Sequence, residues 1–270
     1  KGGNMKLGDS LIIEPEDPTN IFYSVGIYGE NLQEMKNTGK IEIGSSGIGL
    51  YSMENKNEVL NTGDIISNSD GAVGIYGMKS VVKNTGNITL SGNDSIGIAV
   101  SIGSTVKNSG IITINGDNSV GIYGNLKSTI INENTGVIYV NGNNSIGIEL
   151  TGASILENYG KIEIASGTIG SRETSTGGPG YKIPSIINAG VIKVDEKFDL
   201  NGLNLIIKPD IESFRKPTID EVAINDYSLE DTKAGFLLTN SVQIIAPSFD
   251  FGTEAVDIDP LFTQGTNARV

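Results

Sequence analysis

The feature that most constrains the fold of this chain is an internal repeat of about 24 residues. An Asn-x-Gly triplet recurs at spacings of 24, 23, 24, 26, 24 and 30 residues. The triplets begin at Asn37, Asn61, Asn84, Asn108, Asn134, Asn158 and Asn188. An apolar-Gly-apolar triplet keeps the same period with the glycines Gly26, Gly49, Gly74, Gly97, Gly121 and Gly147, and Ile169-Gly170 continues the period before Ser171. Because two separate landmarks share one period, each repeat is one structural unit.

Each repeat has room for three short strands and no helix. In the unit that begins at Gly86, residues 86–90, 95–99 and 105–108 are rich in β-branched side chains, and Gly, Asn, Asp and Ser separate them. This composition is typical of strands joined by tight turns. Three strands and three corners in about 24 residues predict one coil of a parallel β-solenoid, so we expect an all-β fold. Leucine-rich repeats and trimeric β-rolls fit less well, since the first need a fixed Leu pattern and the second a shorter period.

Alternation along each strand predicts which side chains point into the core. In the first strand of the unit, Ile88 and Leu90 point inward and Thr89 outward. In the second strand, Ile96 and Ile98 point inward and Gly97 outward. The same rule assigns to the core the first apolar residue in the second strand of each repeat, namely Val25, Ile48, Val73, Ile96, Val120 and Ile146.

The asparagines of the Asn-x-Gly triplets predict a ladder of side-chain amides at one corner. An amide at a corner can bond to its equivalent one coil away. The predicted members are Asn37, Asn61, Asn84, Asn108, Asn134, Asn158 and Asn188. The alternative is that Asn and Gly only tolerate positive φ at a turn.

The repeat divides the chain into three parts. Residues 1–20 are expected to form an incomplete first coil, residues 21–194 regular coils, and residues 195–270 an irregular continuation or cap. The period is lost after residue 194. The last part also carries a net charge of −8 out of −13 for the whole chain.

Composition excludes several classes of chemistry. The chain of 270 residues has no Cys and no His, which excludes disulfides, thiol catalysis and the commonest metal ligand. The net charge of −13 argues against nucleic acid as a partner. We therefore expect no cofactor and no metal site. Asp70, Asp94 and Asp117 are better explained by Asx turns than by calcium, because the Gly-Gly-x-Gly-x-Asp pattern of calcium-binding repeats is absent.

The repeat also resembles a known family. Asn-Thr-Gly, an Ile-x-Ile strand, Gly-x-Asn-Ser and Ile/Val-Gly-Ile-Tyr-Gly together resemble the passenger repeats of large Gram-negative autotransporter adhesins, over roughly residues 20–194. The segments 246–252 and 258–269 are similar to passenger regions of the same family. The resemblance implies a right-handed parallel β-helix at the bacterial cell surface and an outer-membrane translocator barrel elsewhere in a longer polypeptide.

Two features are candidates for binding. The position after Gly-Ile in the second strand recurs on one outer face, where it forms a column that contains Tyr28, Tyr51, Tyr76 and Tyr123. Tyrosine suits a protein or sugar partner, because it has a large rigid surface with a polar tip. The alternative is a stack of tyrosines that only stabilises the solenoid. A stretch at 171–181 lengthens one coil and predicts a loop, in which Arg172 and Tyr181 suit contact with a partner.

These observations predict a non-enzymatic adhesin segment that binds a protein or glycan on a host or bacterial surface, without membrane contact of its own. One alternative is a stalk that presents a distal binding domain. Another is a polysaccharide lyase or hydrolase on the same fold, although no acid/base pair can be named.

Overall fold

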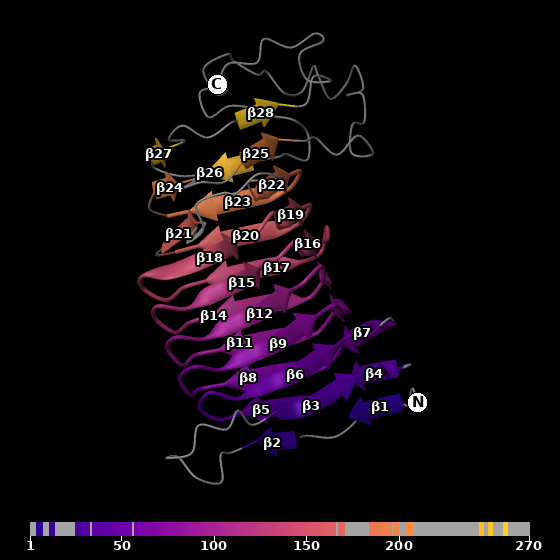
Figure 1. The fold of residues 1–270 in the computed structure, drawn as a ribbon. Helices are drawn as coiled ribbons and strands as arrows, with labels where there is room; N and C mark the ends of the chain where they lie inside the picture. The colour runs from indigo at the N-terminus through magenta and orange to yellow at the C-terminus, as the bar shows by residue number, and fades with distance from the viewer. Residues whose placement is uncertain are drawn as a thin grey trace, which may run out of the picture.

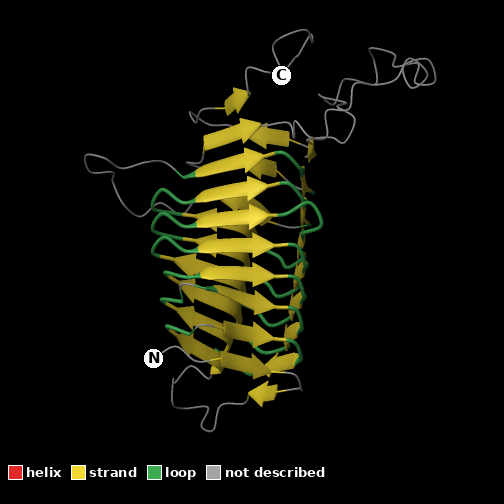
Figure 2. Cartoon of the chain, turned by 90° about the vertical axis from the view of Figure 1, so that its right-hand side faces the viewer, coloured by secondary structure: helices red, strands yellow, loops and turns green. Residues whose placement is uncertain are grey.

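The structure is a computed structural model, and it describes residues 4–7, 11–13, 25–32, 34–55, 57–165, 167–170, 184–195, 197–199, 204–207, 243–245, 248–250 and 256–258. Within these residues every regular element is a β-strand. The strands form parallel sheets that stack along one axis (Figures 1 and 2). The predicted parallel β-solenoid with three strands per coil is therefore confirmed.

Three long sheets run along the solenoid, and from β1 to β21 each successive coil adds one strand to each sheet. Sheet A contains β1 (Asn4–Leu7), β4 (Glu34–Asn37), β7 (Glu58–Asn61), β10 (Val81–Asn84), β13 (Thr105–Asn108), β16 (Thr129–Asn132), β19 (Ile155–Asn158), β22 (Ser185–Asn188), β25 (Asn204–Ile207) and β28 (Val256–Ile258). Sheet B contains β2 (Leu11–Ile13), β5 (Lys40–Ile43), β8 (Asp64–Ser67), β11 (Asn87–Leu90), β14 (Ile111–Ile114), β17 (Val137–Val140), β20 (Lys161–Ile164), β23 (Val191–Val194) and β26 (Gln243–Ile245). Sheet C contains β3 (Val25–Glu30), β6 (Ile48–Met53), β9 (Val73–Met78), β12 (Ile96–Ser101), β15 (Val120–Gly124), β18 (Ser145–Leu150) and β21 (Gly167–Gly170).

Two further strands, β24 (Lys197–Asp199) and β27 (Ser248–Asp250), pair with each other in parallel. The late strands β26 and β28 also pair in parallel, with β23 and β25 respectively. The described strands after residue 194 thus extend the parallel stacks. The boundaries predicted at residues 20 and 194 remain predictions.

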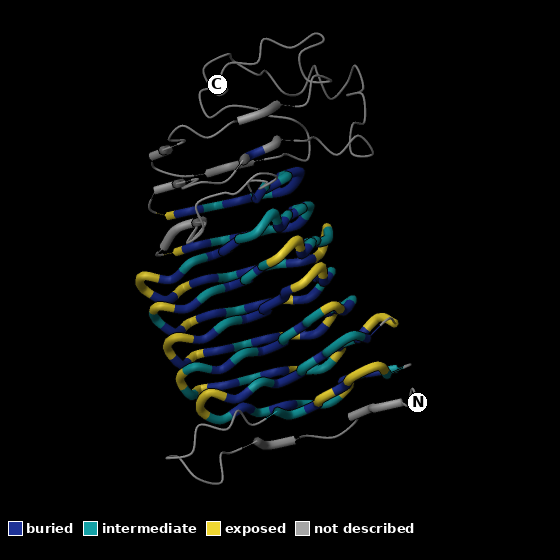
Figure 3. The backbone as a smooth tube through the Cα atoms, in the orientation of Figure 1, coloured by how far each residue is buried: buried dark blue, intermediate teal, exposed yellow. Residues whose placement is uncertain are grey.

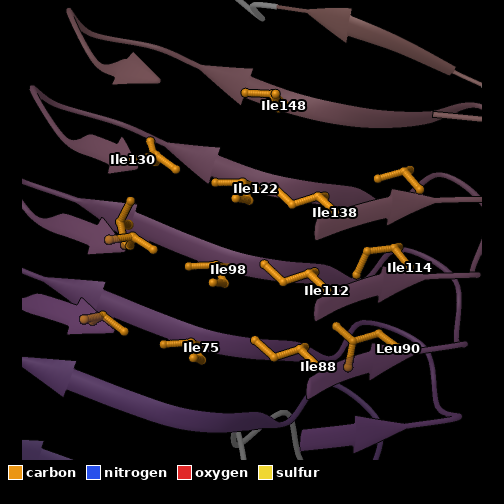
Figure 4. Close-up of a cluster of buried hydrophobic side chains, with 14 of the residues drawn as sticks. Ile75, Ile88, Leu90, Ile98, Ile112, Ile114, Ile122, Ile130, Ile138 and Ile148 are labelled. Carbon is orange, nitrogen blue, oxygen red and sulfur yellow. The ribbon is translucent and has the colours of Figure 1, made fainter. Parts of the chain in front are cut away.

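The core is a stack of equivalent aliphatic side chains. In sheet B, Ile88, Ile112 and Ile138 lie in register on consecutive strands and are fully buried (Figure 4). Ile98 and Ile122 repeat this arrangement in sheet C. Burying one isoleucine stabilises the fold by about 1.5–3 kcal/mol. Exposed residues gather at the corners between the sheets (Figure 3).

One polar residue occupies a core position of sheet B. Ser67 is 2% exposed and stands in register with Leu90 of the next coil. Its hydroxyl donates a hydrogen bond to the Ile43 carbonyl at 2.7 Å. The buried hydroxyl is therefore satisfied and does not disrupt the stack.

The predicted inward positions of sheet C were partly wrong. Ile48 is half-exposed, whereas Gly49 and Leu50 are both buried. A Cβ built on Gly49 would lie 2.8 Å from Ile65 Cγ2 and 3.0 Å from Ile43 Cδ1, so the glycine faces the core. The isoleucines of sheet B fill the space that a side chain at Gly49 would need. Because Gly49 and Leu50 both face the core, the residue before them, Ile48, points outward. The outward residues include Ile48, Val73, Ile96, Val120 and Ile146, all of intermediate exposure.

Candidate functional site

The outer face of sheet C differs in composition from the other two outer faces. From β6 to β15 it presents three columns of side chains and no charged residue. The columns are Ile48, Val73, Ile96 and Val120; Tyr51, Tyr76, Ala99 and Tyr123; and Met53, Met78 and Ser101. The outer face of sheet A carries Glu34, Lys36, Glu58, Lys83, Lys107 and Glu157, and that of sheet B carries Lys40, Glu42, Asp64, Lys161, Glu163 and Lys193. Charges of both signs therefore lie along the outer face of sheet A and at the two ends of the outer face of sheet B, where β11, β14 and β17 carry none. The sheet C face combines the absence of charge with columns of tyrosine and methionine.

The predicted tyrosine column lies on this face. Strand pairing places Tyr28, Tyr51 and Tyr76 in direct register, followed by Ala99 and Tyr123. The rings of Tyr28 and Tyr51 meet edge to face with centroids 5.3 Å apart and planes at 72°. Tyr51 and Tyr76 meet at 5.0 Å and 89°. These contacts stabilise the column by about 0.5–1.5 kcal/mol per pair.

Acidic side chains mark the two ends of the column. At the N-terminal end, the Tyr28 hydroxyl donates a hydrogen bond to Glu30 Oε2 at 2.8 Å. This bond, followed by burial and by the charge of Glu30, raises the pKa of Tyr28. Burial is the main cause of the raised pKa of Tyr51. At the other end, Glu149 follows Tyr123 in register and is 8% exposed.

The corner between sheets C and A adds two exposed apolar residues beside this face. Ile102 is 39% exposed and Leu126 is 50% exposed. They occupy equivalent positions in neighbouring coils, where Gly103 N donates to the Leu126 carbonyl at 2.8 Å. Ile102 has φ of 55° and Leu126 has φ of 51°. A β-branched residue is strained in this left-handed region, so core packing does not explain Ile102.

An asparagine ladder runs along the corner between sheets A and B. Each buried amide donates from Nδ2 to Oδ1 of the next, over distances of 2.7 to 2.9 Å. The members are Asn37, Asn61, Asn84, Asn108, Asn132, Asn158 and Asn188. Several amides also donate to the carbonyl of the following glycine, as Asn84 does to Gly86 at 3.2 Å. These bonds satisfy buried polar atoms that have no access to water.

The prediction of Asn134 as a ladder member was wrong, since Asn132 occupies that position. This coil has two additional residues between its ladder asparagine and its glycine, so the Asn-x-Gly triplet is displaced from the strand end. Asn132 is buried at the end of β16 and Asn134 is exposed. The pattern apolar-x-Asn, as in Ile130-Ile131-Asn132, would have found the right residue.

Sequence reasoning missed two serine ladders at the other corners. Before sheet A, Ser128 N donates to Ser154 Oγ at 3.1 Å, and Ser80 N donates to Ser104 Oγ at 3.2 Å. Before sheet C, a second set is buried in the same way, and its members are Ser95, Ser119 and Ser145. The signal was present as serines that recur every 24 or 26 residues.

The turns between sheets B and C contain the three aspartates that the sequence assigns to turns, Asp70, Asp94 and Asp117. Asp70 Oδ1 accepts a hydrogen bond from Asn93 N at 2.8 Å, and Asp117 Oδ1 accepts one from Asn143 N at 2.7 Å. Among the described residues, no group of three or more His, Cys, Asp or Glu could hold a metal ion. The described part of the chain also contains no helix long and apolar enough to cross a membrane. Arg172 and Tyr181 lie outside the described residues.

Comparison with known proteins gives one match, to a family model. A family model described as the BigA beta sandwich domain matches residues 231–270. No curated protein and no solved structure matches the chain. The strands described inside the matched span, β26, β27 and β28, all pair in parallel with earlier strands of the chain. The match and the β-solenoid together fit a bacterial surface protein of the adhesin type.

Proposed function

We propose that this chain is a non-enzymatic segment of a bacterial surface adhesin, of the autotransporter passenger type, and that it binds through the outer face of sheet C. The observation that carries the proposal is the uncharged face from β6 to β15, which combines columns of tyrosine and methionine and lies beside the charged outer face of sheet A. Interfaces are depleted of charge at their centre and enriched in Tyr and Met. The partner is a protein or glycan on a host or bacterial surface, and the chain is displayed outside the cell by a translocator elsewhere in the polypeptide.

The two glutamates in the outer column of sheet B are too far apart to form a catalytic pair. Glu42 and Glu163 belong to one outer column of sheet B, five strands apart. At about 4.8 Å per strand they are separated by about 24 Å. Paired carboxylates of glycoside hydrolases lie within about 10 Å of each other.

The experiment is a binding assay with purified chain on epithelial cells, bacterial cells and a glycan array. We expect binding to at least one surface and its loss when Tyr51 and Tyr76 are both replaced by Ser. The matched control is Tyr139→Ser, which removes a half-exposed tyrosine from the outer face of sheet B. Equal loss in the control, or turnover of an acidic polysaccharide, would contradict the proposal.

A rigid spacer is the second candidate. Sheet A contains ten hydrogen-bonded strands, which at about 4.8 Å per strand span about 43 Å. This continuous stack supports a stalk that holds another domain away from the cell. Absence of binding by the intact folded chain would favour the stalk.

A further inference from the structure

The borders of the sheet C face differ in charge, and this difference points to the kind of partner. The turns that lead into sheet C from sheet B cover residues 44–47, 68–72, 91–95, 115–119 and 141–144. They contain Asp70, Asp94 and Asp117 and neither Lys nor Arg. In the described part of the chain, the ion pairs join Lys40 to Glu42, Lys79 to Glu54, Lys107 to Glu58, Lys161 to Glu163 and Lys193 to Asp195, so none includes these aspartates.

The three aspartates form an acidic border along one side of the apolar face. They belong to consecutive coils but not to one column. Asp70 and Asp117 occupy the same turn position with Asn93 between them, about 10 Å apart at about 4.8 Å per coil. Asp94 lies one residue further along its turn, level with Gly71 and Asn118. Hydrogen bonds between coils fix the positions of Asp70 and Asp117. The opposite border has a different character, since Ile102 and Leu126 are exposed there together with the Lys79–Glu54 ion pair and the exposed Lys127. The face is thus apolar in the middle, acidic on one side and mixed on the other, where apolar side chains lie beside charges of both signs.

The ring geometry favours a protein over a sugar. A sugar chain stacks on aromatic faces that lie flat and side by side. The planes of Tyr51 and Tyr76 are at 89° to each other, and those of Tyr28 and Tyr51 at 72°, so neighbouring rings cannot form one flat platform. Edges and hydroxyls alternate with faces, which suits an irregular apolar protein surface.

The net charge argues against a second copy of this chain as the partner. Each copy carries −13, and two copies repel each other over any face. A cationic partner is attracted instead, and the acidic border fixes which way round it docks.

We infer that the outer face of sheet C binds a protein whose contact surface is apolar and carries Lys or Arg along one edge. This inference rests on the proposed function and names its partner class. The apolar columns and the tyrosines bury the centre of the partner surface, and Asp70, Asp94 and Asp117 pair with the basic edge. Ile102 and Leu126 extend the contact on the border opposite the three aspartates.

The test uses amphipathic helical peptides as probes, because a helix of about 20 residues is about 30 Å long and covers the four strands of the face, which span about 14 Å. One peptide has a Leu/Phe stripe flanked on one side by lysines, and its partner has glutamates in their place. Fluorescence anisotropy with the full chain measures both affinities at low and high salt. We expect the lysine-flanked peptide to bind at least about tenfold more tightly, with the difference reduced by salt.

Matched variants separate the acidic border from general attraction to an acidic chain. Replacing Asp70, Asp94 and Asp117 by Asn is expected to abolish most of the preference for the lysine-flanked peptide. The control replaces Glu42 and Glu163 by Gln and Asp64 by Asn on sheet B, which changes the net charge equally and is expected to keep the preference. The double substitution Tyr51→Ser and Tyr76→Ser is expected to lower the affinity for both peptides, whereas Tyr139→Ser is expected to change neither affinity.

The outcomes distinguish this inference from the proposed function. Equal effects of the two triple variants, or equal affinity for both peptides, would overturn the inference, and so would tyrosine-dependent binding to neutral glycans alone. Light scattering that shows a dimer lost in the Tyr51 and Tyr76 variant would assign the face to a second copy instead. Tyrosine-dependent binding to cells would leave the proposed function standing in each of these cases, whereas absence of any cell or glycan binding is the failure of the proposed function itself.

Discussion

The amide of Asn108 donates from Nδ2 to Oδ1 of Asn132 at 2.9 Å, while Asn134, two residues further on, is exposed. Asn132 donates in turn to Asn158 at 2.8 Å and to the Gly136 carbonyl at 3.2 Å. Asn132 thus joins three coils through hydrogen bonds. A comparison of Asn132 with the exposed Asn134 therefore measures how much the ladder contributes to stability.

We predict that Asn132→Ala lowers the free energy of unfolding by about 1–3 kcal/mol, because it leaves buried donors and acceptors without partners. Asn108→Ala should have a similar effect, since it interrupts the same ladder one coil earlier. Urea unfolding followed by far-ultraviolet circular dichroism measures the change.

The control for the ladder is Asn134→Ala, which removes an exposed amide from the neighbouring turn. Its effect should stay within about 0.5 kcal/mol. Equal destabilisation by Asn132→Ala and Asn134→Ala would show that the turn, and not the ladder, limits stability at this corner.

A second prediction concerns the inward glycines of sheet C. A Cβ on Gly97 would lie 2.8 Å from Ile112 Cγ2 and 2.5 Å from the Gly121 carbonyl oxygen. Gly97→Ala is expected to destabilise the chain by about 1–3 kcal/mol through overpacking. The comparison is Gly103→Asn, since a Cβ on Gly103 meets nothing within 4 Å and Asn tolerates its φ of 68°. Thermal unfolding of the two variants should differ clearly, and similar midpoints would contradict the inward assignment.

The sequence period was sufficient to predict the fold, because strand length, corner composition and repeat spacing all require the same coil. It was also sufficient to place Tyr28, Tyr51 and Tyr76 in one column. Alternation failed in sheet C, since a strand that places Gly49 and Leu50 both toward the core does not follow a strict period of two. The apolar column beside the tyrosines became visible only once Val73 and Ile96 were known to face outward.

A third prediction concerns the titration of Tyr28. Its hydrogen bond to Glu30 is the main cause of its raised pKa, so Glu30→Gln should lower that pKa toward the ordinary value of about 10. A tyrosine whose pKa is raised by folding stabilises the fold fully below the unfolded pKa. This contribution is lost as pH rises through the raised pKa.

NMR titration with ring-labelled tyrosine measures the shift, and Tyr28→Phe identifies the signal. Tyr51 serves as the internal reference, since burial is the largest cause of its raised pKa and Glu30 only a smaller one. A Tyr28 pKa that does not change in Glu30→Gln would contradict the assigned cause.

The last prediction addresses the cost of the exposed corner at Ile102. A β-branched residue at φ of 55° is strained by about 1–2 kcal/mol, whereas Asn adopts this conformation readily. Ile102→Asn relieves that strain and loses some apolar contact, because the side chain is 39% exposed. Ile111→Asn loses a comparable contact, at 42% exposure, from a strand without such strain. We therefore expect Ile102→Asn to be more stable than Ile111→Asn by about 1 kcal/mol in urea unfolding.

The substitution Ile102→Asn should also lower the affinity for the lysine-flanked peptide, whereas Ile111→Asn should leave it unchanged, since of these two residues only Ile102 borders the sheet C face. Greater stability together with weaker binding would show that the strained isoleucine serves recognition, and unchanged binding in Ile102→Asn would remove this corner from the contact surface.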